Sequence, residues 1–158
     1  MVVEYVSLDG VIQAPGHKTE DPAGGFAHGG WTQPYMADHR RYNNELYPTI
    51  GAFLLGRLTY QGFAAAWPSM KNEFADKLNS MPKYVVSSTL EKAEWNNSTV
   101  LRGDVVAEVS KLRQESSGDI VVHGSAQLVQ TLLANDLIDE LRLMVFPVVP
   151  RQRQAAFQ

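Results

Sequence analysis

The sequence contains no cysteine, which excludes a disulfide scaffold and any zinc site built from thiolate ligands. It has no excess of basic residues either, because 14 Lys and Arg stand against 17 Asp and Glu, for a net charge of -3. A domain with that balance lacks the basic surface that binds nucleic acid. We therefore expect no nucleic-acid partner.

Long hydrophobic runs are also missing. The apolar stretches are much shorter than the roughly 20 residues of a membrane-spanning helix, and Glu4 and Asp9 interrupt the one near the N-terminus. We expect no signal peptide, no membrane partner and, by default, a cytoplasmic location. The 158 residues leave room for one domain with a hydrophobic core.

The hydrophobic pattern predicts strands and helices in alternation. Strands are expected at residues 2–6, 52–55, 83–87, 98–101, 120–122 and, half-buried, 141–146. Helices are expected at residues 34–47, 59–66, 73–80, 105–112 and around 128–133, with Asp104 as a helix cap. This order predicts an α/β fold with a mainly parallel central sheet flanked by helices. Ligands of such sheets bind at the carboxyl ends of the strands.

A long irregular segment, residues 13–32, follows the first strand and contains five glycines and two prolines. Loops of this length inside a compact domain are usually functional or mobile.

Three strand ends carry residues that suit a phosphate group. In the first, Gly56-Arg57-Leu58-Thr59, the glycine allows close approach, Thr59 lies at a helix start that favours an anion, and Arg57 can bind phosphate through two nitrogens. The same residues also fit a plain turn with Thr59 as helix cap and a surface arginine. This segment alone does not decide between the two interpretations.

The second strand end is Ser87-Ser88-Thr89, where three hydroxyls could donate to a phosphate, although a polar loop explains them better. The third is His123-Gly124-Ser125-Ala126, which has the strand–glycine–helix context of a pyrophosphate site. It lacks both the GxGxxG motif and the Walker lysine. The three ends together are more informative than any one of them.

These segments, in this order, resemble the dihydrofolate-reductase-like superfamily. The chain is most similar to small bacterial proteins related to the C-terminal reductase domain of the riboflavin-pathway deaminase-reductase. The resemblance covers residues 2–149 and is carried by Val6–Ile12, Gly24–Phe26, Gly29–Trp31, Leu54–Phe63, Trp67–Pro68, Tyr84–Leu90, Val122–Ser125 and Leu137–Leu141. It implies a dihydrofolate-reductase-like domain over residues 1–149, followed by an atypical tail at 150–158.

The resemblance implies NADPH as the cofactor, bound in an extended pose. By that analogy Arg57, Ser87 and Ser88 meet the phosphate on the adenosine side, which distinguishes NADPH from NADH. Gly56 and Thr59 contact the pyrophosphate.

By the same analogy Gly124, Ser125, Ala126 and Gln127 receive the pyrophosphate from the opposite side, and Ile12 lines the nicotinamide. The cofactor carries the hydride chemistry, and the protein supplies orientation and electrostatics. No residue is indicated as catalytic, and the proton donor is not identified.

One departure from the superfamily concerns the substrate. Dihydrofolate reductases place a carboxylate on the first helix, shortly after a Trp-x-x-Pro segment that Trp31–Pro34 matches here. Met36 stands where the acid is expected. Asp38, two residues on, is rotated by about 200° on a helix. We expect a substrate pocket with Trp31 and Met36, and no reduction of dihydrofolate itself.

A second departure is the tail at residues 150–158, which has neither the glycine turn nor the closing strand pair of the superfamily. We therefore expect the C-terminal strands to be missing or altered. The sheet would then have an unprotected edge, and such an edge favours pairing with another chain. A homodimer is one form that this pairing could take.

Histidine spacing gives no metal site, because His17, His28 and His39 are eleven residues apart rather than three or four. His123 is expected near the cofactor, since the segment lacks the turn of a hydrolase nucleophile. Core packing is expected for Trp67 and Trp95.

The leading hypothesis is an NADPH-dependent reductase of a small planar heterocycle, such as a pyrimidine- or pteridine-like compound. The expected reaction is of the type catalysed by 5-amino-6-(5-phosphoribosylamino)uracil reductase in the riboflavin pathway. The alternative is a non-catalytic nucleotide- or small-molecule-binding domain on the same fold. A third possibility is a purely structural dimerisation module.

Overall fold

The computed structural model describes residues 1–150, apart from the side chain of His39. It contains one six-stranded sheet in the order β4-β3-β2-β5-β1-β6, and all neighbouring strands run parallel. The strands are β1 Val2–Ser7, β2 Ile50–Gly56, β3 Lys83–Val86, β4 Ser98–Leu101, β5 Asp119–His123 and β6 Leu141–Phe146. The α-helices are α1 Met36–Leu46, α2 Arg57–Ala66, α3 Glu73–Ser80, α4 Val105–Glu115 and α5 Ala126–Ala134.

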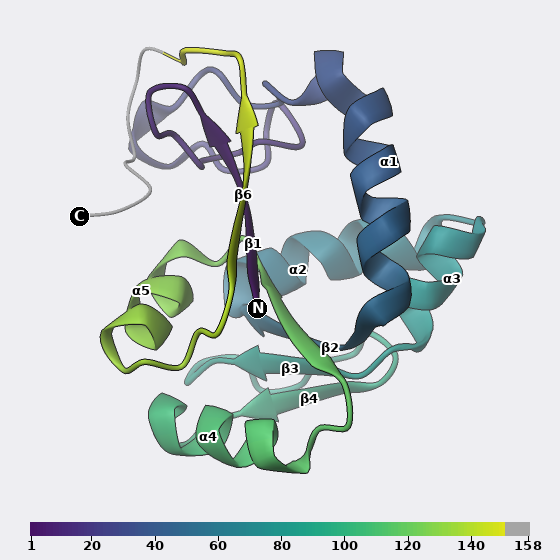
Figure 1. The fold of residues 1–158 in the computed structure, drawn as a ribbon, viewed down its shortest axis with the longest axis vertical. Coiled ribbons are helices and arrows are strands. Elements are labelled where there is room, and N and C mark those ends of the chain that lie inside the picture. Colours follow the sequence, from purple (N-terminus) through teal and green to yellow (C-terminus); the bar gives the residue numbers. More distant parts are fainter. Residues whose placement is uncertain (151–158) are drawn as a thin grey trace.

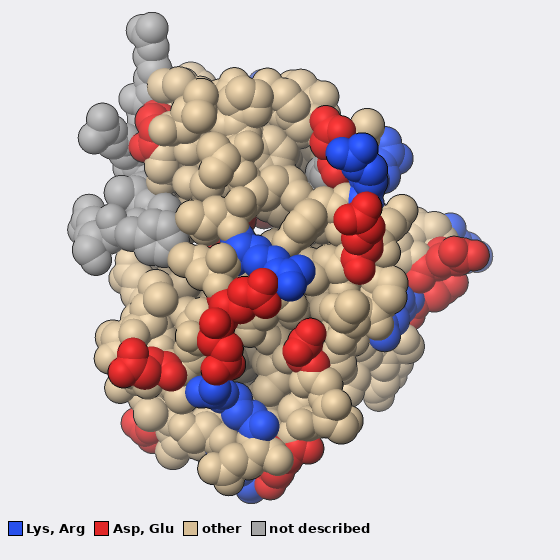
Figure 2. Space-filling model, viewed as in Figure 1, with Lys and Arg blue, Asp and Glu red and all other residues tan. Residues whose placement is uncertain are grey.

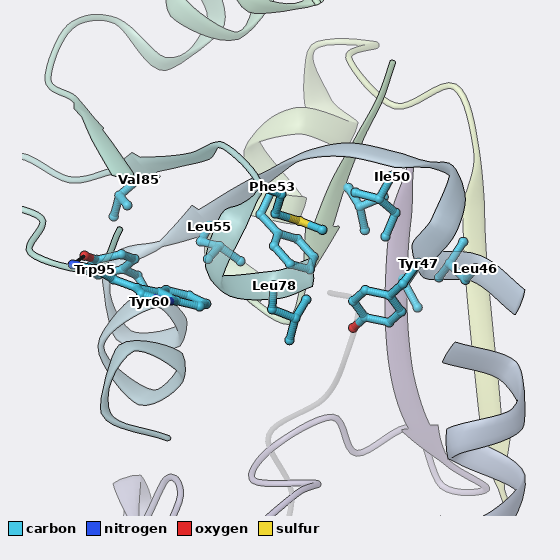
Figure 3. Packing of buried hydrophobic residues seen from close by; sticks show 12 residues of the cluster. Leu46, Tyr47, Ile50, Phe53, Leu55, Tyr60, Leu78, Val85 and Trp95 are labelled. Atoms are coloured by element: carbon cyan, nitrogen blue, oxygen red, sulfur yellow. Dashed lines mark hydrogen bonds between the residues drawn. The ribbon is translucent and has the colours of Figure 1, made fainter. Parts of the chain in front are cut away.

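Helices cover both faces of the sheet, with α1, α2 and α3 on one face and α4 and α5 on the other (Figure 1). The first face holds the larger core, in which Phe53 of β2 packs among Tyr47, Leu78 and Ile50 (Figure 3). Strands β1 and β2 are largely buried on both sides, and their sequences are accordingly mostly apolar. The predicted α/β fold with a parallel sheet flanked by helices is confirmed.

Helix boundaries differ from the prediction at two places. Short 3-10 turns, Gln33–Tyr35 and Tyr47–Thr49, flank α1, so the helix predicted at residues 34–47 is shorter than expected. Helix α2 begins at Arg57, directly after Gly56, so the predicted cap at Thr59 is wrong. The cap predicted at Asp104 is confirmed, because its carboxylate accepts from Ala107 N at 2.8 Å.

The irregular segment after β1 folds over a third, smaller cluster of buried side chains that includes Phe26, Trp31 and Phe146. The buried Gln13 amide holds the segment together by donating to the carbonyls of Asp21 and Ala23, at 3.1 and 2.9 Å. The segment therefore packs against the sheet through these buried side chains and is held by internal hydrogen bonds.

Strand β6 forms one edge of the sheet among the described residues. Phe146 at the end of this strand is buried. The side chains of Leu141, Leu143 and Val145, in contrast, are 39%, 44% and 56% exposed. Pairing with a second chain along this edge stays a prediction, and the tail predicted from residue 151 onward lies outside the described residues. No helix in residues 1–150 is both long and apolar enough to cross a membrane.

Candidate nucleotide-binding site

Two of the predicted phosphate loops come together because β2 and β5 are neighbours in the sheet. The Ser125 hydroxyl accepts a hydrogen bond from Gly56 N at 2.9 Å and donates to Thr59 Oγ1 at 3.0 Å. The loops also touch closely, since a Cβ added to Gly124 would lie 3.4 Å from Thr59 Oγ1. Ser125 thus joins the loop after β5 to the loop after β2.

The backbone before α5 adopts an uncommon conformation. Gly124 and Ser125 both have positive φ angles, 58° and 67°. For a residue other than glycine this region costs on the order of 1 kcal/mol, and such residues cluster at binding sites. The bonds from Ser125 to Gly56 and Thr59 hold this conformation in place.

Helices α2 and α5 both begin at this edge without a side-chain cap. Helices α3 and α4, in contrast, are capped by Asn72 and Asp104, whose side chains accept from backbone amides. The first amides of an uncapped helix keep their donors available, and the helix dipole favours an anion there. The edge therefore presents two helix starts suited to one phosphate-bearing ligand.

Arg57 is the first residue of α2, and its guanidinium donates to the Gln61 amide at 3.2 Å. It forms no ion pair with a carboxylate of residues 1–150. A half-buried arginine held only by a neutral amide can exchange that contact for a phosphate.

Ser87 and Ser88 follow β3, the strand next to β2, in which Val86 pairs with Gly56. The buried Ser87 oxygen accepts from the amides of Thr89 and Leu90, at 3.2 and 2.9 Å, so it organises its own turn. Ser88 is exposed. The structure brings both serines to the same edge as Gly56.

Sequence reasoning missed Arg102, which directly follows β4. Its guanidinium donates to the carbonyls of Leu90 and Glu91, at 2.7 and 2.6 Å, and so fixes the loop that Ser87 begins. Arg102 could have been identified from the sequence by its place immediately after a strand, which is also the place of Arg57.

A tight turn ends β1 at the place predicted for the nicotinamide. Ser7 Oγ accepts from Val11 N at 2.8 Å and donates to Asp9 Oδ1 at 2.6 Å, while Gly10 supplies the positive φ of 84°. Ile12 follows this turn and is half-buried. Beyond the second loop, Ala126 is half-buried and Gln127 is exposed at the start of α5.

The two predicted substrate residues lie in different surroundings. Trp31 is 8% exposed, donates through Nε1 to Gln13 O at 2.9 Å and packs edge-on against the Phe146 ring. Met36 is half-buried and is the first residue of α1, whereas Asp38 is exposed.

A polar cluster on the α1 face of the sheet was not predicted from the sequence. The Tyr5 hydroxyl lies 3.3 Å from His123 Nε2 and 3.5 Å from Asn43 Oδ1. These residues come from β1, β5 and α1, and His123 immediately precedes Gly124. Burial raises the pKa of Tyr5 well above its ordinary value, so the hydroxyl keeps its proton at neutral pH.

Two cavities of the described residues lie away from this edge. One, of about 300 Å³, borders Met1, Asp119 and Arg113, and the other, of about 370 Å³, lies between α2 and Trp95. Charged side chains on the face seen in Figure 2 occur as mixed groups of both signs.

Comparisons with known proteins identify the family and the fold of the chain. The family model of the RibD C-terminal domain matches residues 1–150. Bacillus subtilis YyaP is 33% identical over 82 residues, 52% of this chain and 43% of YyaP. Bacillus subtilis YwjB is 26% identical over 144 residues, 91% of this chain and 74% of YwjB. The match thus spans less than half of YyaP, and neither name states an activity.

A solved structure has a similar fold. It is a protein of Shewanella sp. PV-4, described as a riboflavin biosynthesis protein, and it matches with a TM-score of 0.65 over 99% of this chain and 81% of that one. The sequence identity is 19%, so the likeness concerns the fold alone.

Proposed function

The chain belongs to the RibD C-terminal domain family, as its motifs predicted, and on that premise we propose that it is an NADPH-dependent reductase. The proposed substrate is a small planar heterocycle, pyrimidine- or pteridine-like, as in the reduction of 5-amino-6-(5-phosphoribosylamino)uracil. The observation that carries the proposal is the bridge from Ser125 to Gly56 and Thr59, which joins two uncapped helix starts at one edge.

The residues present fit the phosphates of such a cofactor. The amides at the starts of α2 and α5 bind the pyrophosphate, and Gly124 lets the backbone approach it where a side chain would meet Thr59. Arg57 binds the phosphate on the adenosine side, assisted by Ser88. When bound, the reduced nicotinamide supplies a hydride, which carries two electrons to the substrate.

A non-catalytic binding domain is the second candidate. The observation that favours it is Met36, half-buried at the start of α1 where dihydrofolate reductases carry an acid. Cofactor binding without turnover of any pteridine or pyrimidine would favour this candidate over the reductase.

Direct titration tests the proposal. Increasing NADPH is added to the protein while nicotinamide fluorescence is followed, and saturable binding is expected. The same titration with NADH should give weaker binding, because NADH lacks the phosphate assigned to Arg57. If NADPH fails to bind even at large excess, the proposed function is wrong.

Replacing Arg57 by alanine should weaken NADPH binding selectively. A charge-assisted hydrogen bond contributes about 1.5–3 kcal/mol, so the Kd for NADPH should rise roughly 10- to 100-fold. The Kd for NADH should change little. Fluorescence titration of both cofactors measures the difference.

Lys111→Ala is the matched control, because it also removes one positive charge, from an exposed position on α4. Its NADPH affinity should equal that of the original protein. An equal loss in both variants would mean that only net charge matters. If Arg57→Ala leaves NADPH affinity unchanged, Arg57 is not the phosphate ligand. An unchanged affinity is also the result expected for a purely structural dimerisation module.

A further inference from the structure

Arg102 directly follows β4, just as Arg57 directly follows β2. The strand between them is β3, and its last residue pairs with the last residues of both neighbours, so the three strands end in register. Arg57, Ser87 and Arg102 therefore leave the sheet side by side at one edge (Figure 1). Because neighbouring strands are about 4.8 Å apart, the two arginines start about 10 Å from each other, with the Ser87 loop between them.

The loop formed by residues 87–91 is held at both of its ends. At its start, the Ser87 amide belongs to the hydrogen bonds between β3 and β4, and Ser87 Oγ accepts from Leu90 N at 2.9 Å. At its end, Arg102 Nη2 donates to the carbonyls of Leu90 and Glu91, at 2.7 and 2.6 Å. Leu90 is thus fixed through both its amide and its carbonyl. Ser88 is exposed within this fixed segment.

The charges of the two arginines are not neutralised by the described residues. Neither Arg57 nor Arg102 forms an ion pair with a carboxylate of residues 1–150. Arg102 donates to backbone carbonyls, and Arg57 donates to the Gln61 amide. Asp104, the acid that follows Arg102 most closely, instead caps α4 through Ala107 N. Positive charge therefore lies on both sides of Ser88.

We propose that Arg102 is a positioning residue for the phosphate on the adenosine side of NADPH. It holds the loop of residues 87–91 so that Ser88 is kept beside Arg57, and it thereby contributes to the preference for NADPH over NADH. This inference rests on the proposed reductase function and deepens it, because it assigns part of the cofactor specificity to a residue outside the phosphate ligands.

The physical basis is the preorganisation of an exposed loop. A loop with few buried contacts loses conformational freedom when it binds a ligand, and that loss weakens binding. A guanidinium presents its donors in a fixed plane, so Arg102 can hold two successive carbonyls in one geometry before the ligand arrives. Arg102 acts through Ser88, and it need not touch the phosphate.

Replacing Arg102 by alanine should weaken the binding of NADPH and not that of NADH. We expect the Kd for NADPH to rise roughly 10-fold, because the Ser88 hydroxyl loses most of its hydrogen bond to a charged phosphate. The Kd for NADH should change less than about 2-fold, because NADH lacks this phosphate. Titrations of both cofactors followed by nicotinamide fluorescence measure the two changes.

Lys92→Ala is the matched control for charge. Lys92 directly follows the loop, is 78% exposed at its side chain and lies 3.6 Å from Glu94. The substitution removes one positive charge near Ser88 without removing a bond to the Leu90 or Glu91 carbonyl. Its NADPH affinity should equal that of the original protein. If Lys92→Ala weakens NADPH binding as much as Arg102→Ala does, Arg102 contributes only its charge and the positioning role is overturned.

A double variant separates positioning from direct contact. If Arg102 acts through Ser88, then Arg102→Ala combined with Ser88→Ala should bind NADPH about as weakly as Ser88→Ala alone. Independent effects would instead multiply, to a loss of roughly 100-fold. A multiplied loss would mean that Arg102 acts on the phosphate without Ser88, which overturns the positioning role.

The remaining outcomes distinguish this inference from the proposed function. If the original protein binds NADPH and Arg102→Ala binds it equally well, the role of Arg102 is overturned and the reductase proposal stands. The same holds if Arg102→Ala weakens NADPH and NADH binding equally, because the residue then supports the loop without affecting specificity. If the original protein does not bind NADPH, the proposed function itself fails.

Discussion

Replacing Glu4 by glutamine should remove most of the dependence of stability on pH between about 5 and 8. Glu4 lies on β1 beside Leu143 of β6, is 5% exposed, and its Oε1 has no hydrogen-bond partner among the described residues. Burial raises the pKa of this carboxyl from 4.5 to about 8. The folded protein therefore keeps the proton of Glu4 at neutral pH.

The sign of the effect follows from proton binding. Between the unfolded pKa of 4.5 and the folded pKa of about 8, the folded state holds more protons than the unfolded state. Its free energy of unfolding falls as pH rises through this window, by about 5 kcal/mol in total, and then stays level. Glu4→Gln does not titrate, so it should lose this slope and exceed the original protein in stability at pH 8.

Urea unfolding at several pH values measures this difference. Glu45→Gln on α1 is the matched control, since Glu45 is exposed and its substitution should leave the slope intact. Parallel stability curves for the original protein and Glu4→Gln would show that Glu4 is ionised in the folded state, contrary to this prediction.

The alternation of apolar segments was sufficient to predict the parallel sheet, because strands that alternate with helices form parallel sheets with helices packed on their faces. The strand order could not be predicted in the same way. Only the placement of β5 beside β2 brings Ser125 against Gly56, which is 69 positions away in the chain. The sequence thus indicated both glycine-containing loops without indicating their contact.

Local patterns failed where a side chain had a more distant partner. Thr59 has the composition of a helix cap, but Gly56 adopts an extended conformation that lets α2 begin at once. The Thr59 hydroxyl instead accepts from Ser125. In the Ser87 loop the partners are local, because the hydroxyl accepts from the amides of Thr89 and Leu90 in its own turn. Its contact with a phosphate stays a prediction.

The polar cluster had no signal along the chain. Tyr5 is 38 positions from Asn43 and 118 from His123, and each residue alone fits an ordinary strand or helix. Tertiary structure alone makes them neighbours, so no motif along the chain could indicate them.

Lys83→Met should lower the free energy of unfolding by about 3 kcal/mol, the largest effect expected from the amino end of β3. Lys83 is fully buried and donates from Nζ to the carbonyls of Asn79, Met81 and Asn96, at 3.2, 2.8 and 2.8 Å. Its ammonium also lies 4.3 Å from the centre of the Trp95 ring. One side chain thus ties the end of α3 to the loop before β4.

The methionine variant matches the volume of lysine but removes the ammonium donor from these carbonyls, of which Asn79 O still accepts from the Asn96 side-chain amide at 3.1 Å. The loss therefore measures the polar contacts of Lys83 rather than a cavity. Lys71→Met at an exposed position is the control and should change stability by less than about 0.5 kcal/mol. Urea denaturation at neutral pH compares the two variants.

Because Lys83 lies at the opposite end of β3 from Ser87, cofactor affinity should not change in Lys83→Met. Equal stability of both variants would mean that Lys83 adds nothing beyond its packing.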